Sequence, residues 1–131
     1  MPKETAAQRD GRRYEARVGR WLALRAAALG LTVWDHTWLE YQFCHESRTR
    51  RAQPDFVLEA EDGGFGYVFE VKQTWVDTTT QLELYTTLLH ALGLDVIPAT
   101  LCHNLTPDTP RDLIVRSFDD IEAGSVMLVR K

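Results

Sequence analysis

The sequence is poor in cysteine and has no long apolar run. Its 131 residues include two cysteines, Cys44 and Cys102, which are too few for a disulfide framework and fit a reducing environment. No apolar stretch approaches the roughly 20 residues that a membrane-spanning helix needs. The polar, charged first residues do not resemble a secretory signal. We therefore expect a cytoplasmic protein that does not enter a membrane.

Repeats, low-complexity tracts and linker-like segments are also missing, so nothing marks an internal domain boundary. Hydrophobic residues make up 44% and charged residues 26% of the chain, as in ordinary globular proteins. A chain of this length can build a hydrophobic core without disulfide or metal support. The sequence therefore predicts one domain over residues 1–131.

Positive charge is concentrated in the first part of a chain whose net charge is −4. Residues 1–51 contain ten Lys and Arg against six Asp and Glu, whereas residues 52–131 contain five against thirteen. Such asymmetry is expected when one rim binds phosphates and acids elsewhere bind metal or face solvent. The candidate phosphate-binding arginines are Arg13, Arg17, Arg48, Arg50 and Arg51. For the arginines before residue 30 alone, a solvated helix face is the simpler interpretation.

The order of apolar, turn and capping residues predicts a mixed α/β fold. Thr5 and Gln8 resemble a capping box, and the chain then has a helical pattern to about Leu29, with Gly30 as the stop. Further along we expect one long or two short strands at 31–43, a polar loop at 44–53, a hairpin at 54–72, a helix at 78–92, and strands at 95–102, 113–118 and 125–130. Pro98 places its strand at a sheet edge or a bulge.

The strongest chemical motif lies on the expected hairpin. Asp55 begins one strand, and Glu70 and Lys72, two residues apart, leave the same face of the next. The turn-forming sequence at 61–66 folds the two strands back on each other, which can bring the three side chains to one spot. Carboxylates hold a hard divalent cation and a lysine positions the attacking water, so this group suits metal-assisted phosphodiester hydrolysis.

Glu15 has an unusual environment for a glutamate on a helix. Its neighbours on one helix face are Gly11, Val18 and Gly19, and burying a carboxylate is costly unless it is paired or binds a metal. The two glycines hint at close approach by backbone or ligand. The alternative is a glutamate at the rim of the helix that pairs with Arg12 or a neighbouring arginine.

Gln81 and Tyr85 share one face of the expected second helix. Both can donate hydrogen bonds to a phosphate or to metal-bound water. Two plainer interpretations stay open: Thr78 and Gln81 form a capping box, and Tyr85 is a core aromatic. His36 and His90 belong to no pattern, and we interpret them as structural or surface residues.

Together, these residues resemble the PD-(D/E)xK nuclease superfamily, over roughly residues 8–102. Asp55, Glu70 and Lys72 match its central motif, Glu15 matches its helical glutamate, and Gln81 with Tyr85 matches the QxxxY element of the RecB-like branch. The spacing is also similar to small VRR-Nuc-like and Holliday-junction-resolvase-like domains. The resemblance implies a restriction-endonuclease-like core, in which helices flank a mixed central sheet.

The resemblance also implies a function and a set of site residues. It implies that Mg²⁺ or Mn²⁺ is bound by Asp55, Glu70, the Val71 carbonyl and Glu15, with Lys72 and Gln81 among the catalytic residues. The expected activity is weakly specific or structure-directed hydrolysis of DNA that leaves a 5′-phosphate, in repair, recombination or phage replication. The nucleic-acid contacts would come from the five candidate arginines, Gln73 and Tyr85. A homodimer would let such a small domain grip a duplex, and two cysteines cannot hold an iron–sulfur cluster.

Three other interpretations compete with a nuclease. A nuclease-like fold without activity would serve as a DNA-binding or assembly module, although degenerate members of the superfamily usually lose a motif residue. An unrelated α/β domain would match by accident. Cys44-His45 and Cys102-His103 invite a zinc site, but adjacent residues of a strand point to opposite faces and supply two ligands poorly.

Overall fold

The first element is a long helix, α1 (Ala6–Leu29), in the computed structural model, which describes residues 3–110, 113–117 and 126–130. The capping box is confirmed, since the Thr5 side chain accepts from Gln8 N and the Gln8 side chain accepts from Thr5 N. Gly30 ends the helix in the left-handed region, with a φ of 71°. The residues buried along α1 are Tyr14, Val18, Leu22 and Ala26. Leu29, the last residue of the helix, is exposed.

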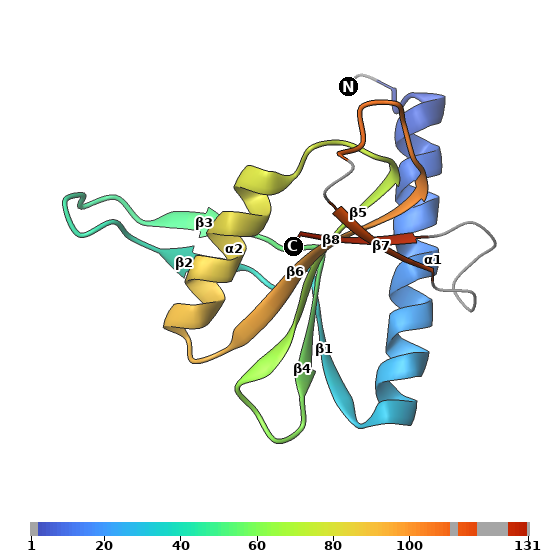
Figure 1. The fold of residues 1–131 in the computed structure, drawn as a ribbon. Helices are drawn as coiled ribbons and strands as arrows, with labels where there is room; N and C mark the ends of the chain where they lie inside the picture. Colours follow the sequence, from blue (N-terminus) through green and yellow to red (C-terminus); the bar gives the residue numbers. More distant parts are fainter. Residues whose placement is uncertain (1–2, 111–112, 118–125, 131) are drawn as a thin grey trace.

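A mixed sheet of six strands forms the centre of the fold, as predicted (Figure 1). Its order is β1–β4–β5–β6–β8–β7, and within this sheet β5 and β6 run parallel while the other neighbours are antiparallel. The strands are β1 (Leu31–Asp35), β4 (Phe56–Ala60), β5 (Phe65–Thr74), β6 (Asp95–Asn104), β7 (Leu113–Ser117) and β8 (Val126–Arg130). Pro98 lies where β8 no longer accompanies β6, because β8 pairs from Ala99 onward. The prediction of an edge strand is therefore wrong, because β6 lies between β5 and β8, although no β8 pairing is present at Pro98 itself.

The predicted hairpin is formed by β4 and β5, which pair from Phe56 with Phe69 to Glu59 with Gly66. Gly63 and Gly64 turn the chain with φ values of 77° and 80°, which side chains with a Cβ rarely adopt. The hairpin therefore forms from the turn chemistry that the sequence displays.

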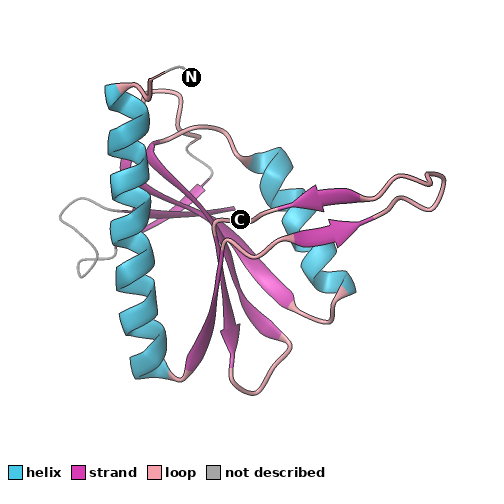
Figure 2. Cartoon of the chain, turned by 180° about the vertical axis from the view of Figure 1, so that it is seen from behind, coloured by secondary structure: helices cyan, strands magenta, loops and turns pink. Residues whose placement is uncertain are grey.

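A second helix, α2 (Thr79–Ala91), covers the sheet face opposite α1 (Figures 1 and 2). Alternate residues of β4 and β5 therefore enter two cores. One core joins α1 to Phe56, Phe69 and Val71, and the other joins α2 to Val57 and Val68. Since Glu70 and Lys72 alternate with Phe69 and Val71, they lie on the α2 side of β5.

A short separate sheet extends from the body of the molecule (Figures 1 and 2). It pairs β2 (Leu39–Tyr41) with β3 (Arg50–Ala52) in antiparallel register, and we call residues 37–53 the arm. Leu39 and Ala52 are buried at its base in the α2 core. The prediction of an entirely polar loop over 44–53 is therefore wrong at Arg50–Ala52, while two short strands within 31–43 are confirmed.

Within the described residues, neither helix combines the length and the apolar character needed to span a membrane.

Candidate active site

The hairpin brings the central motif together. Asp55 lies directly before β4, and its Oδ2 accepts a hydrogen bond of 2.8 Å from the backbone N of Val71 in β5. The β4–β5 pairing begins at Phe56. The Asp55 side chain therefore accepts a hydrogen bond from a backbone N–H that lies just beyond the end of this pairing. This bond fixes the Asp55 carboxylate beside the residue that lies between Glu70 and Lys72.

Glu70 is the most strongly perturbed acid at this position. Its side chain is buried, and its Oε1 has no hydrogen-bond partner among the described residues. Burial, and then the negative charge of Asp55, raise the pKa of Glu70 to about 7, against the opposing effects of Lys72 and the Tyr85 hydroxyl. The pKa of Asp55 is also raised, by burial above all and then by the charge of Glu15. Burial and a neighbouring negative charge thus raise the proton affinity of both carboxylates, and oxygen ligands of this kind could hold a cation.

Tyr85 reaches the same place from α2. It is buried, and its hydroxyl donates to the Gln53 carbonyl at 3.4 Å. Burial and the charge of Glu70 raise the pKa of the Tyr85 phenol, so this group stays protonated as a donor. Gln81 lies one turn earlier on α2, where its side chain is exposed.

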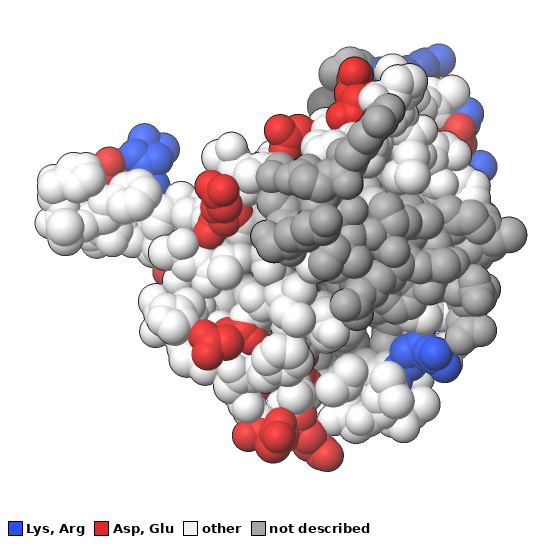
Figure 3. All heavy atoms as spheres, in the orientation of Figure 1, with Lys and Arg blue, Asp and Glu red and all other residues white. Residues whose placement is uncertain are grey.

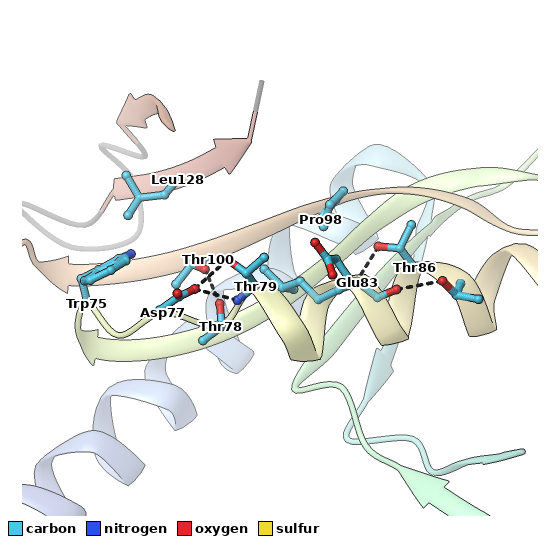
Figure 4. Close-up of a pocket in the computed structure, with 11 residues that line it drawn as sticks. Trp75, Asp77, Thr78, Thr79, Glu83, Thr86, Pro98, Thr100 and Leu128 are labelled. Atoms are coloured by element: carbon cyan, nitrogen blue, oxygen red, sulfur yellow. Dashed lines mark hydrogen bonds between the residues drawn. The ribbon is translucent and has the colours of Figure 1, made fainter. Parts of the chain in front are cut away.

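The start of α2 is fixed by a threonine-rich cluster beside the site (Figure 4). Asp77 Oδ1 accepts from the backbone N of Thr79 at 3.0 Å, and the Thr78 and Thr100 hydroxyls bond to each other at 2.9 Å. The Thr78 side chain makes no capping bond, so the Thr78–Gln81 capping box is wrong and Asp77 takes that role. A hollow of about 450 Å³ lies between this cluster, α2 and β6. Thr100, which lines this hollow, lies opposite Glu70 in the β5–β6 ladder, but neither Glu70 nor Asp55 lines the hollow itself.

A second set of ligand-type residues shares Asp55. Glu15 on α1, His36 after β1 and Asp55 each offer an atom within 4.8 Å of the others. His36 Nε2 bonds to Glu15 Oε1 and lies 3.8 Å from Asp55 Oδ1, while His36 Nδ1 bonds to Asp35. Glu15 is thus paired with His36, and the alternative of an Arg12 partner is wrong because Arg12 binds Glu4 at 2.9 Å.

His36 is the site residue that the sequence did not identify. Burial lowers the pKa of His36, but hydrogen bonds to Asp35 and Glu15 outweigh burial and raise that pKa above its usual value. Its backbone has a φ of 53°, an uncommon value for a residue with a Cβ, and its N donates to the Asp55 carbonyl at 3.0 Å. An Asp-His pair at the end of a strand was the available signal, and we had interpreted His36 as structural or surface.

The arginines of α1 lie beside Gln73 of β5. Arg13, Arg17, Arg20 and Gln73 line a hollow of about 400 Å³ together with Asp10 and Ala16. In the view of Figure 3, basic side chains appear at the arm and along the α1 edge, while acidic ones cover the α2 side. Gln73 follows Lys72 directly in β5, and because adjacent strand residues point to opposite faces, this basic hollow lies on the α1 face whereas Lys72 lies on the α2 face.

The three arm arginines lie on or beside β3, and two of them are ion-paired. Arg50 makes two hydrogen bonds to Glu46, of 3.0 and 2.9 Å, and Arg51 lies 3.4 Å from Glu40. Arg48 is exposed before β3. Ion pairs with Glu46 and Glu40 thus neutralise part of the positive charge that the sequence placed on the arm.

The zinc interpretation of the Cys-His dipeptides has no support in the geometry. Among the described residues, Glu15, His36 and Asp55 are the one group of three or more metal-ligand residues close together, and neither dipeptide belongs to it. Cys44 is exposed on the arm, whereas Cys102 is buried in β6, where burial raises its thiol pKa to about 12.

No protein-family model matches the chain, and neither a curated protein nor a solved structure matches it. The functional argument therefore depends on these residues and their chemistry.

Proposed function

We propose that this protein is a metal-dependent nuclease with a restriction-endonuclease-like core, a member of the PD-(D/E)xK superfamily that hydrolyses phosphodiester bonds in DNA. The observation that carries the proposal is the meeting of Asp55 and Glu70, where the buried Glu70 Oε1 has no hydrogen-bond partner in the described part of the chain and the Glu70 pKa is about 7. An uncompensated buried carboxylate is costly, and proteins keep such groups where function requires them. Lys72, on the same strand face, adds the third motif residue.

The donors at this position fit a hard divalent cation. Asp55, Glu70, Glu15 and the Val71 carbonyl are oxygen donors of the kind that Mg²⁺ and Mn²⁺ prefer, and Glu70 Oε1, which has no hydrogen-bond partner among the described residues, keeps its lone pairs available to an ion. When bound, the ion would polarise the scissile phosphate and lower the pKa of a water molecule. His36, within 4.8 Å of Glu15 and Asp55, adds a nitrogen donor, which favours Mn²⁺ or a later transition metal over Mg²⁺.

The remaining side chains orient the reactants. The Lys72 ammonium lies near Glu70 and Asp55, and both acids experience its charge. We assign to Lys72 the orientation of the attacking water and the neutralisation of charge that develops on the phosphate. Tyr85 supplies a protonated hydroxyl, and Gln81 extends the same helix face toward solvent, where it would meet the nucleic acid.

The basic hollow on α1 would hold the nucleic-acid backbone. Arg13, Arg17 and Gln73 line it, and contacts of this kind bind phosphates without reading bases. The proposed activity is accordingly weakly specific or structure-directed, in repair, recombination or phage replication, with a homodimer as the form that grips a duplex. Arg48, Arg50 and Arg51 would extend the contact along the arm.

A non-catalytic nucleic-acid-binding or assembly module is the second candidate. One observation favours it: His36 lies among Glu15, Asp35 and Asp55, and its raised pKa favours the protonated form, which would compensate part of the acidic charge. Under this candidate the acids would be structural and no ion would be needed. It does not account for the unpartnered oxygen of Glu70.

The test is metal-dependent cleavage of single-stranded, duplex, flapped and four-way DNA and of RNA, with Mg²⁺ or Mn²⁺ and with EDTA. Lys72→Ala should abolish cleavage. Lys3→Ala, which removes an exposed lysine distant from Lys72 in the sequence, should leave cleavage intact. Cutting by wild type that EDTA and Lys72→Ala both remove supports the nuclease. Binding without cutting under every metal condition supports the module.

A further inference from the structure

The arm is fixed at both ends to the candidate site. Residues 37–53 leave the body immediately after His36 and return to it two residues before Asp55. The two ends are joined by a bond of 3.0 Å from His36 N to the Asp55 carbonyl, and by one of 2.8 Å from Gln53 Nε2 to the His36 carbonyl. Any molecule bound along the arm is therefore held at a fixed distance from Asp55.

Aromatic rings line the arm and are open to solvent. Trp38 is 54% exposed and Phe43 is 43% exposed. The Phe43 and His45 rings are stacked, with centroids 5.9 Å apart and planes 12° apart, and Tyr41 meets Phe43 edge-on at 5.6 Å. Flat rings held by one another present a rigid surface for a further flat group.

Arginines on the arm cover rings and also bind glutamates. Arg50 lies 5.2 Å from the Phe43 ring centre and Arg51 lies 5.5 Å from that of Trp38. Arg50 is also held by Glu46, and Arg51 by Glu40. Three arginines against two glutamates leave residues 37–53 with a formal charge of only +1. The arm therefore offers stacking surfaces more than net charge.

We propose that the arm binds unpaired nucleotides of the substrate by stacking their bases on Phe43 and Trp38, next to the site of cleavage. Exposed aromatic rings with guanidinium groups bind single-stranded nucleic acid because every base has a free π face, whereas paired bases are already stacked. This inference rests on the proposed function and assigns it a substrate class, nucleic acid with an unpaired segment.

The length of the arm sets where the unpaired segment lies. Each strand of the arm contains three residues, which extend about 10 Å from its base. One strand of a B-form duplex advances about 3.4 Å per nucleotide, so the ends of these strands lie about three nucleotides from the base of the arm. The unpaired segment would start within that distance of the scissile phosphate.

A second copy of this chain is the rival occupant. The arm is poorly suited to it, since β2 and β3 contain only three residues each and the guanidinium groups of Arg50 and Arg51 interrupt the apolar surface. Edge pairing or hydrophobic association with another copy would use longer and more continuous apolar strands.

The experiment measures binding separately from cleavage. Fluorescence anisotropy in EDTA would follow a labelled 12-nucleotide thymidine oligomer, a blunt duplex and a flapped duplex, each with wild type and with variants. Phe43→Ala and Trp38→Ala should each weaken single-strand binding by about 5- to 150-fold, the range for loss of one stacked base. Blunt-duplex binding should change less than about twofold, because it depends on phosphate contacts.

Two variants control for folding and for apolar surface. Phe43→Trp keeps a flat ring and should retain single-strand affinity within about threefold of wild type. If Phe43 had only a structural role, the affinity would not depend on whether the replacement is aromatic. Leu24→Ala removes a 74% exposed apolar side chain from α1 and should leave binding of all three probes unchanged. Circular dichroism would show that each variant is folded.

Unchanged single-strand affinity in both alanine variants overturns the proposal, as does an equal loss on blunt duplex. A wild-type dimer that becomes monomeric in Phe43→Ala, measured by light scattering, overturns it in favour of self-association. The two proposals can fail separately. If the arm binds unpaired nucleotides but nothing is cleaved, only the nuclease proposal is refuted. If cleavage does not change when Phe43 or Trp38 is replaced, only the proposal for the arm is refuted.

Discussion

Replacing Glu70 with glutamine should stabilise the metal-free protein. Glu70 is buried, its Oε1 has no hydrogen-bond partner in the described part of the chain, and Asp55 lies beside it. At neutral pH the fold must therefore hold a carboxylate in surroundings that oppose its charge. Glutamine has nearly the same shape without the charge, so Glu70→Gln removes this opposition and leaves the packing in place.

The size of the effect follows from the pKa. The pKa of Glu70 rises from 4.5 to about 7 on folding, and a tenfold change in proton affinity is worth about 1.4 kcal/mol. The folded state thus binds this proton more tightly than the unfolded state, by about 3 kcal/mol. The resulting stability is fully present below pH 4.5 and is lost as the pH rises through about 7. At pH 8 the free energy of unfolding of Glu70→Gln should exceed that of wild type by up to about 3 kcal/mol, and near pH 4.5 the two should agree.

Urea denaturation in EDTA, followed by tryptophan fluorescence, measures this difference. With a denaturant slope near 2 kcal/mol per M, Glu70→Gln should move the midpoint at pH 8 upward by about 1.5 M. Glu83→Gln, at an exposed glutamate of α2, is the matched control and should change stability by less than about 0.5 kcal/mol. Metal at 100 times its Kd should stabilise wild type by about 2.7 kcal/mol and have little effect on Glu70→Gln. A Glu70→Gln variant that is no more stable than wild type at pH 8 would refute the reasoning.

Gly19→Ala should destabilise the fold by about 1–3 kcal/mol, because an added Cβ would lie 2.9 Å from Cζ of the buried Phe56 ring. Gly11→Ala, with nothing within 4 Å of the new Cβ, should instead stabilise it by about 1 kcal/mol, and urea denaturation of both variants compares them directly. Asp55→Ala should lower Mn²⁺ affinity at least about 100-fold in a calorimetric titration, and undiminished affinity would exclude Asp55 as a ligand. Arg13→Ala should reduce the slope of log affinity for duplex DNA against log salt by about 0.9, and an unchanged slope would place the DNA elsewhere.

Those parts of the fold that depend on local signals were predictable. The Thr5 capping box, the Gly30 stop and the glycine turn of the hairpin each act over a few residues, and each is present. The ends of α2 were predicted within one residue for the same reason, since Gly93 adopts a φ of 88° just beyond the helix. The spacing of Gly11 and Gly19 around Glu15 predicted close approach by backbone or ligand, and this prediction is wrong: a side chain, that of Phe56, approaches Gly19, and nothing described lies within 4 Å of a Cβ built at Gly11.

The arm was not predictable in the same way. Its strands contain three residues each, too few to establish an alternating pattern, and β3 consists of two arginines and an alanine. What holds β3 in place is the pairing of Arg51 with Glu40 and the burial of Ala52 against α2, both of which join distant parts of the chain. The arginines and serine before Pro54 indicated a loop, because local composition does not reveal contacts with distant parts of the chain.

In the candidate site too, the residues joined by local structure were predictable and those joined by distant contacts were not. Asp55, Glu70 and Lys72 were identifiable because a single hairpin brings them together. His36 was not, because its position depends on a left-handed backbone conformation between β1 and the arm and on Glu15 of a helix 21 residues away. Tyr85 also reaches the acids only through the packing of α2, which its QxxxY spacing indicated but could not position.

Asp55 joins the two sets of candidate ligands, and this position determines how the site should respond to substitution. Its Oδ2 accepts from Val71, beside Glu70, while its Oδ1 lies 3.8 Å from His36, which binds Glu15. Removing Glu15 or Glu70 would leave one set complete, whereas removing Asp55 breaks both. Its backbone carbonyl also accepts from His36 N and so fixes the base of the arm. Metal affinity and the pKa of Glu70 should therefore both change in Asp55 side-chain variants, whereas the arm, which is held through the Asp55 backbone carbonyl, should keep its place.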